Sequence, residues 1–329
     1  MQKQYRSQLP GGRFLKAAAA CLLAFSASAM AAEEPPVRLV VPFPPGGSTD
    51  IAARIIQPKF AEALGRNVIV ENKPGANTQI ASAFVARSAP DGNTLLLSFD
   101  SHSINPIIKS DLPYDTFKDF KGIAFALRFP LVIGASQTTP GNNLKEFLEA
   151  AKAKPDAYNY ASAGVGSLSQ LAAEDLKRRA DVQILHVPYA GGGPMVQSLL
   201  NGSSNITMLS YAALKANIEA GKIKPLAITG TKRLRDLPNV PTVEESGYPG
   251  FEAYSWQAVW VPAATPDDVA KQLSDAFLTA LNDAEVKKRL NEIGFEVIAT
   301  DGASAERYAV EQYDRWTKFV KETGLSLAE

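Results

Sequence analysis

Two glycine-rich segments constrain the fold of this 329-residue chain more than any other feature. The first runs from Pro42 to Asp50 (PFPPGGSTD) and the second from Ala161 to Ser167 (ASAGVGS). Each follows a strand-like apolar run and precedes a run with helical periodicity. The start of a helix presents N–H groups without intrahelical partners and a partial positive charge, which favours anions. The sequence therefore predicts two α/β units that each present a helix start to an anion.

The N-terminus has the three-part pattern of a secretory signal peptide. Four basic residues precede an apolar run at 17–29, which is shorter than the ~20 residues of a membrane span. Small residues then allow cleavage after Ala29 or after Ala31, so we assign residues 1–31 to the signal peptide. An uncleaved anchor and lipidation of Cys21, the only cysteine, are the alternatives. The pattern predicts export to the periplasm.

Composition limits the partners of the mature chain. Removal of the four basic residues in the leader leaves 30 Lys and Arg against 34 Asp and Glu. No dense basic stripe occurs, which argues against nucleic acid as a partner. The mature part contains no cysteine and therefore no disulfide, and its roughly 300 residues suffice for two domains.

Strand-like and helix-like runs alternate along the mature chain, which favours mainly parallel sheets flanked by helices. In the first unit we expect strands at 37–43, 68–70 and 94–97, and helices at 50–64 and 77–88. In the second unit we expect strands at 131–133, 158–160, 184–187, 206–209 and 226–229, and helices at 144–153, 168–179, 194–201 and 212–220. A helical region with Thr265 as N-cap and Pro266 at N1 extends to Gly294, and a last helix covers 305–322.

Motifs of the common catalytic sites are missing from the sequence. It contains no Gly-x-Ser-x-Gly elbow, no phosphate-binding Gly-Lys-Ser/Thr and no His-Glu-x-x-His, so we expect no catalytic residue, metal or cofactor. His102, between two serines, is the best candidate base for an exported hydrolase, although no acid is placed to orient it. The alternative is a loop histidine that binds a ligand or caps a turn. His186, inside a strand-like run, is predicted to be structural.

The two glycine-rich loops offer groups that bind anions. In the first loop the glycines permit positive φ, and Ser48 and Thr49 supply hydroxyls and amides at the helix start. Asp50 has two open interpretations: it contacts the ligand, or it caps the helix and pairs with Arg54 one turn later. In the second loop, Ser167 is expected to cap the following helix.

A set of short motifs stands in order along the mature chain. They are Pro42-x-x-Pro45-Gly46-Gly47-x-x-Asp50, Val70-Glu71-Asn72-Lys73-Pro74-Gly75-Ala76, Pro90-Asp91-Gly92, Leu112-Pro113-Tyr114-Asp115, His186-Val187-Pro188-Tyr189, Leu226-Ala227-Ile228-Thr229 and Leu237-Pro238-Asn239-Val240-Pro241-Thr242. In this order the set resembles the Bug family, the TctC-type periplasmic solute-binding receptors of tripartite tricarboxylate transporters. The resemblance covers essentially the whole mature chain.

The resemblance implies a two-domain periplasmic-binding-protein (Venus flytrap) fold that closes on a small organic mono-, di- or tricarboxylate, aromatic ones included. The receptor would be a monomer and would deliver this anion to inner-membrane permease subunits of the TctA/TctB type. We expect domain 1 at 32–127 plus 254–329, domain 2 at 128–253, and a hinge at the two crossings. A ligand-sensing subunit for a membrane sensor kinase is an alternative that the sequence does not separate from transport.

Family members hold carboxylates with loop amides and bridging waters more than with arginines. This chain departs from the family pattern in two regions. One is Gly202-Ser203-Ser204-Asn205, followed by Met208-Leu209-Ser210-Tyr211, and the other is Gly92-Asn93, with Asp100-Ser101-His102 further on. Both regions could face the cleft, so the ligand need not be citrate-like. The expected ligand-binding residues are Phe43, Gly46, Gly47, Ser48, Thr49, Asp50, Ser101, His102, Ser162, Ala163, Gly164, Gly166, Ser167, Tyr189 and Ser210.

Overall fold

The computed structural model describes residue 1 and residues 34–327, and the segment 2–33 that holds most of the predicted signal peptide lies outside them. Within the described residues no helix is both long and apolar enough to cross a membrane. The strands are β1 (Val37–Val41), β2 (Val68–Asn72), β3 (Thr94–Leu97), β4 (Phe120–Ser136), β5 (Asn159–Ser162), β6 (Leu185–Pro188), β7 (Ile206–Ser210), β8 (Ile223–Ile228), β9 (Tyr254–Pro262) and β10 (Glu296–Asp301). The helices are α2 (Ser48–Leu64), α3 (Gln79–Ala86), α4 (Ser101–Ile108), α5 (Leu144–Ala153), α6 (Leu168–Ala180), α7 (Gly192–Leu200), α8 (Tyr211–Glu219), α9 (Asp267–Asn282), α10 (Ala284–Glu292) and α11 (Gly302–Thr323).

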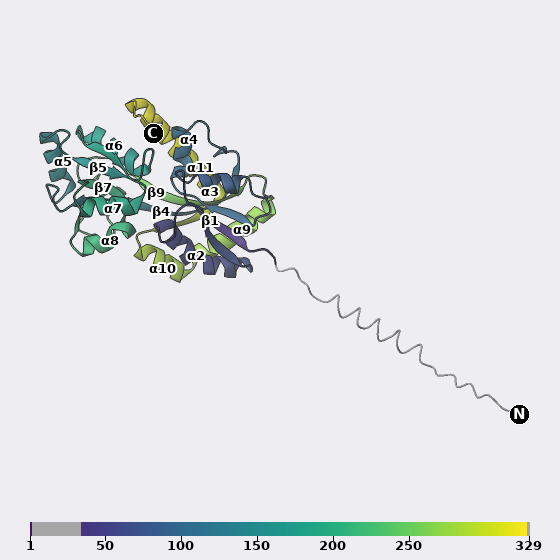
Figure 1. Ribbon diagram of the computed structural model, residues 1–329. Coiled ribbons are helices and arrows are strands. Elements are labelled where there is room, and N and C mark those ends of the chain that lie inside the picture. The colour runs from purple at the N-terminus through teal and green to yellow at the C-terminus, as the bar shows by residue number, and fades with distance from the viewer. Residues whose placement is uncertain (2–33, 328–329) are drawn as a thin grey trace. The chain divides into compact units, whose positions relative to one another are not determined.

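The long strand β4 belongs to two groups of strands. Its part from Phe120 to Pro130 pairs antiparallel with β9, and its part from Leu131 to Ser136 pairs antiparallel with β7 and β8. The strand order is β2-β1-β3-β9-β4-β7-β5-β6, and β10 also pairs with β4. Figure 1 shows α5 to α8 gathered around β5 and β7, apart from the helices that surround β1. The fold is therefore mixed α/β, with β4 running from one group into the other.

The expected parallel pairing is present in the strands that precede the glycine-rich loops. β1 pairs parallel with β2 and β3, and β5 pairs parallel with β6 and β7. The antiparallel pairs come from β4, β9 and β10. Strand β9 is buried along its whole length, as expected for a strand with neighbours on both edges and helices over the sheet.

A close backbone contact fixes the start of α11 against β4. A Cβ atom on Gly302 would lie 2.0 Å from the carbonyl oxygen of Gly122, and one on Gly122 would lie 2.4 Å from the carbonyl oxygen of Gly302. Only glycine allows two backbones to approach this closely. The C-terminal helix is thereby held on the part of β4 that pairs with β9.

Two expected features of the helices are corrected by the structure. Pro266 is the N-cap residue of α9 rather than its first helical residue, and the hydroxyl of Thr265 finds no hydrogen-bond partner in the described part of the chain. The expected helical region up to Gly294 is two helices, because the Asp283 carboxylate caps the new helix α10. The structure also contains a helix that the sequence does not predict, α4. Pro106 lies inside it, and a proline inside a helix removes a backbone donor and argues against a helix there.

Candidate functional site

A cavity of about 510 Å³ lies where the loops at the carboxyl ends of the strands meet. In open α/β sheets, ligands bind at this end of the strands. The cavity wall includes Ser48 at the start of α2, and Ser167, Leu168 and Ser169 at the start of α6. Both helix starts predicted from the glycine-rich loops therefore border one cavity.

Side chains of α6 hold the second glycine-rich loop in place. The Ser167 hydroxyl accepts the N–H of Gln170 at 3.4 Å and donates to the carbonyl oxygen of Gly164 at 2.7 Å, which confirms Ser167 as the N-cap. The N–H of Gly166 donates to the side-chain oxygen of Gln170 at 2.6 Å. The loop is thus rigid and already satisfies part of its own backbone.

Free N–H groups lie in the first turn of α6, whereas those of Ala163, Gly164 and Gly166 in the glycine-rich loop have partners. The N–H of Ala163 donates to Ser169 Oγ at 3.0 Å, and that of Gly164 donates to Ser162 Oγ at 3.2 Å. The backbone N–H groups of Leu168 and Ser169 have no hydrogen-bond partner within residues 34–327. Because both residues line the cavity, the first turn of α6 offers its donors there.

His186 supports the second loop from β6. Its Nδ1 lies 3.3 Å from the Gln170 side-chain nitrogen, which only donates, so Nδ1 accepts and Nε2 carries the proton. That Nε2 lies 2.6 Å from the hydroxyl of Ser162, and the ring stacks on Tyr160. Burial lowers the pKa of His186, which agrees with this neutral form. The Ser162 hydroxyl therefore binds His186, and Ser162 does not line the cavity.

Asp50 tethers the first glycine-rich loop. Its carboxylate accepts the N–H of Gly46 at 2.9 Å, both oxygens accept from Arg54 Nε, and Asn72 Nδ2 donates to it at 2.9 Å. Asn72 also donates to the carbonyl oxygen of Phe43 at 2.9 Å. Burial raises the pKa of Asp50, but the hydrogen bonds from Arg54, Gly46 and Asn72 outweigh it and lower the pKa overall. Of the two interpretations, the structure therefore favours a tether over a ligand contact.

The start of α2 carries no side-chain cap. Its N-cap residue is Gly47, and the N–H groups of Ser48 and Thr49 have no hydrogen-bond partner in the described chain. The hydroxyl of Thr49 is turned into the core, where it accepts from Gln257 Nε2 at 3.1 Å. The first turn of α2 therefore offers backbone donors, with Ser48 on the cavity wall.

A left-handed turn after β2 forms another part of the wall. The four residues from Gly75 to Thr78 all have positive φ, including +46° at Ala76 and +71° at Thr78. Asn105 Nδ2 donates to the carbonyl oxygen of Asn77 at 2.9 Å, and the hydroxyl of Thr78 lies 2.7 Å from that of Ser101. Such conformations persist only where the surroundings impose them, and they cluster at ligand sites. Ser101 thus supports the turn from α4 and does not line the cavity.

His102 lies in an aromatic core instead of the cavity. Its ring stacks on that of Trp260, with 4.6 Å between the ring centroids, and packs edge-to-face with Phe120, with 5.1 Å between the centroids. Neither ring nitrogen has a hydrogen-bond partner among the described residues, and burial lowers the pKa of His102 to about 3. The structure therefore favours none of the roles considered from the sequence, a base, a ligand contact or a turn cap, because the ring lies outside the cavity and its nitrogens contact no polar group of the described residues.

The cavity gathers about half of the expected ligand-binding residues. Those that line it are Phe43, Ser48, Ala163, Gly164, Ser167, Tyr189 and Ser210. Those that do not are Gly46, Gly47, Thr49, Asp50, Ser101, His102, Ser162 and Gly166. Asp100, Met208 and Leu209, which lie in the two regions expected to face the cleft, also line the cavity, and the lining residues that sequence reasoning missed include Phe99, Phe129, Leu131, Val165, Leu168, Ser169 and Ser255. No Lys, Arg or His occurs among the described lining residues, so backbone donors are left to hold an anion.

Both regions that depart from the family pattern reach the cavity, one of them through Met208, Leu209 and Ser210. The other reaches it through Asp100. Ser204 is buried and lies 3.2 Å from the hydroxyl of Tyr189, and Asn93 accepts from Arg66 at 2.6 Å, so neither lines the cavity. The rule that ligands bind at strand carboxyl ends could have identified Asp100, since β3 ends at Leu97.

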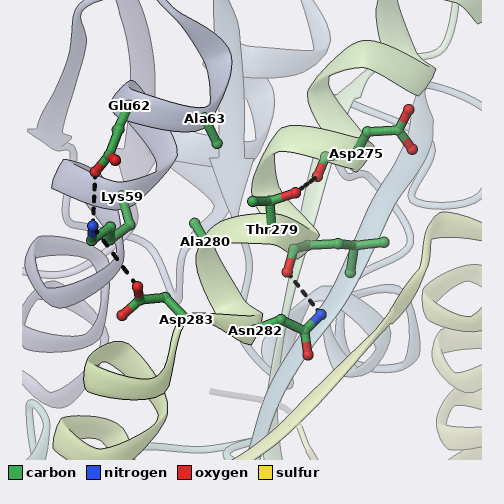
Figure 2. Close-up of a pocket in the computed structure, with 9 residues that line it drawn as sticks. Lys59, Glu62, Ala63, Asp275, Thr279, Ala280, Asn282 and Asp283 are labelled. Carbon is green, nitrogen blue, oxygen red and sulfur yellow. Dashed lines mark hydrogen bonds and ion pairs between the residues drawn. The ribbon is translucent and has the colours of Figure 1, made fainter.

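A second hollow, of about 720 Å³, lies between α2 and α9 (Figure 2). Lys59 Nζ lies 2.8 Å from the Glu62 carboxylate and 3.8 Å from that of Asp283. Asp275, a third carboxylate on this wall, pairs with Lys271 at 2.6 Å. Carboxylates outnumber the one lysine on the described wall, so this hollow disfavours an anion and is not the candidate site.

Fold and cavity together define a solute-binding protein of the periplasmic type. The structure of Rhodopseudomonas palustris MatC with bound malate has a TM-score of 0.78 and 31% identity, over 87% of this chain and 98% of that chain. R. palustris Rpa4515 with adipate has a TM-score of 0.82 and 31% identity, over 88% and 97%. The periplasmic binding protein BugD has a TM-score of 0.80 and 33% identity, over 88% and 98%. The two-domain flytrap fold predicted from the sequence is thereby confirmed.

Residues 52–325 match the model of the tripartite tricarboxylate transporter family receptor, TctC. Among curated relatives, Protein BugT of Bordetella pertussis is 31% identical over 294 residues, which cover 89% of this chain and 90% of BugT. The chain belongs to the TctC receptor family, and the resemblance seen in its motifs is confirmed. Its solved relatives are binding proteins, two of them with a dicarboxylate.

Proposed function

We propose that this chain is a periplasmic receptor that captures a small organic carboxylate between two domains and delivers it to a TctA/TctB-type permease. The observation that carries the proposal is the cavity bordered by the uncapped start of α2 and by the first turn of α6. Two helix starts attract a carboxylate without a basic side chain. The adipate and malate complexes of the relatives support the same ligand class.

Several finer features belong to this proposal. Residues 1–31 act as a cleaved export signal, and the mature receptor works as a monomer and as a binding protein rather than an enzyme. Domain 1 comprises 32–127 and 254–329, and domain 2 comprises 128–253. The passage of β4 from its pairing with β9 to its pairing with β7 supports a hinge near residue 128, with a second near 253.

The number of available donors fits a useful affinity. A micromolar dissociation constant corresponds to about −8 kcal/mol. A hydrogen bond to a charged group contributes roughly 1.5 to 3 kcal/mol before the entropy of association is subtracted. Three backbone donors on the cavity wall, at Ser48, Leu168 and Ser169, together with apolar contact from Phe43 and Tyr189, reach this order of magnitude.

The experiment is a thermal-shift screen followed by isothermal titration calorimetry of the mature protein. The panel contains adipate, malate, citrate, terephthalate, nicotinate and amino acids. A ligand at 100 times its dissociation constant stabilises the fold by about 2.7 kcal/mol, which raises the midpoint by a few degrees. Saturable binding supports a receptor, and small-angle scattering should then show a decrease in radius of gyration on closure. A protein that binds no member of the panel contradicts the proposal.

A further inference from the structure

Asp100 is the one residue with a charge-bearing acidic or basic side chain on the described wall of the cavity. Only 5% of it is exposed, and one carboxylate oxygen accepts a hydrogen bond from the hydroxyl of Ser255, which also lines the cavity. No lysine, arginine or histidine pairs with Asp100 anywhere in the described residues. Buried carboxylates are costly unless a cation or several donors compensate them.

Two other buried aspartates of this chain are each paired with an arginine. Asp50, 2% exposed, pairs with Arg54 at 3.0 Å. Asp175, 4% exposed, pairs with Arg178 at 3.2 Å and with Arg179 at 3.0 Å. Asp100 is equally buried, but its described partners are all neutral: the Ser255 hydroxyl and the backbone N–H groups of Ser101 and of Asp100 itself. Burial accordingly raises the pKa of Asp100 to about 7, so the group is only partly ionised near neutral pH.

We propose that the ligand supplies the cation that Asp100 lacks, so that the site selects an amino-substituted carboxylate over an unsubstituted carboxylate or a dicarboxylate. The ligand's carboxylate lies at the starts of α2 and α6, and its ammonium group lies at Asp100 and Ser255. The inference rests on the proposed function, because it places the ligand in the same cavity.

The chemistry of the wall agrees with a zwitterion that has an apolar body. The helix starts supply backbone N–H donors for the ligand's carboxylate. The segment after β3 supplies the Asp100 carboxylate as an acceptor for the ligand's ammonium group. The wall also includes the apolar side chains of Phe99, Phe129, Met208 and Leu209. A dicarboxylate would bring a second negative charge to Asp100, which like charges oppose unless a proton is shared.

The sign of the pH dependence separates these two ligands. Ionisation of Asp100 strengthens its attraction for an ammonium group, so affinity for an amino carboxylate increases as pH rises through about 7. Affinity for a dicarboxylate that shares a proton with Asp100 decreases over the same range. His102, the histidine on the same segment, is buried and neutral with a pKa of about 3, so it does not supply the charge change.

The test is calorimetry at pH 6 and pH 8 with a matched series. Hexanoate, 6-aminohexanoate and adipate share one chain length and differ in the end group, while leucine and phenylalanine are compared with 4-methylpentanoate and 3-phenylpropionate. We expect one amino carboxylate at least to bind about ten- to hundredfold tighter at pH 8 than its unsubstituted analogue and than adipate. Asp100→Asn removes that preference, whereas Asp236→Asn, at an exposed ion pair outside the cavity, retains it.

The outcomes distinguish this inference from the proposed function. Tightest binding of adipate or of an unsubstituted carboxylate, unchanged in Asp100→Asn, overturns the inference and leaves the receptor in place. Absence of binding by every carboxylate overturns both. If Asp100→Asn does not fold, the wild-type protein alone tests the inference. Its affinities for amino carboxylates, unsubstituted carboxylates and adipate are then compared at pH 6 and pH 8, and an amino carboxylate that does not bind more tightly at pH 8 overturns the inference.

Discussion

The backbone N–H of Gly46 donates a hydrogen bond of 2.9 Å to the carboxylate of Asp50, four residues further along the chain. The same carboxylate accepts from Arg54, which follows Asp50 by one turn of α2. One side chain therefore sets both the path of the first glycine-rich loop and its position on the helix. The uncapped start of α2 borders the cavity because of this tether.

Replacement of Asp50 by alanine should release this loop. We expect the free energy of unfolding to fall by about 2 kcal/mol, and carboxylate affinity to fall about tenfold, because several hydrogen bonds to a buried charge are lost. Asp50→Asn keeps an oxygen for the N–H of Gly46 and should lose less. Because the pKa of Asp50 lies below 3.8, its contribution is present above that pH and is lost in acid, so the two proteins should converge in chemical denaturation at low pH.

Gly166 packs against Ile108 of α4. A Cβ atom on Gly166 would lie 2.0 Å from Ile108 Cδ1, and its φ is +73°. We expect Gly166→Ala to destabilise the protein by about 2 kcal/mol, through the clash and through positive φ. Ile108→Ala in the same chain should recover about half of the Gly166→Ala loss, since only the clash is relieved. A double-mutant cycle measures this coupling, and additive losses would show that the two residues do not interact.

Gly46 provides the matched control for this pair. It also has positive φ, +85°, but a Cβ atom there would meet no atom within 4 Å. Gly46→Ala should therefore cost only the conformational strain of about 1 kcal/mol. Equal losses at the two glycines would contradict the assignment of a steric contact to Gly166 alone.

The left-handed turn between β2 and α3 should store strain. Ala76 has a φ of +46°, which an L-residue with a Cβ adopts at a cost, so Ala76→Gly is expected to raise the free energy of unfolding by about 1 kcal/mol. Ala83→Gly, within α3, should lower it by about the same amount. Urea denaturation of the two variants provides the measurement, and destabilisation by both would rule out stored strain at Ala76.

His102 should make the protein sensitive to acid. Its pKa is about 3 in the folded chain and 6.5 in the unfolded reference, so the unfolded state binds more protons between these values and stability falls as pH falls below 6.5. His102→Leu keeps a similar volume beside Trp260 and removes this proton linkage. Relative to the variant, the wild-type protein should lose about 1.4 kcal/mol per pH unit below 6.5. Parallel stability curves would show that His102 is not buried and neutral.

Local patterns predicted most of the elements around the cavity. The expected helix at 144–153 coincides with α5, and Ser167 caps α6, because periodicity and capping act within a few residues. The interpretation of Asp50 could not be decided locally, since the deciding contact comes from Asn72 on β2. The family resemblance placed Asp100 near the cleft but gave it no role, and the turn at 75–78 was missed, because both reach the wall only through packing of β3, α3 and α4.

The central claim is that a carboxylate binds at the starts of α2 and α6, and a ¹⁵N–¹H TROSY titration tests it most directly. The mature protein would be titrated with the tightest carboxylate of the panel. We expect the largest saturable shifts at the amides of Ser48, Leu168 and Ser169, because these residues line the cavity and their N–H groups have no protein partner in the described chain. Saturable binding that leaves these three amides unshifted, or that shifts the residues around Lys59 instead, would contradict the claim.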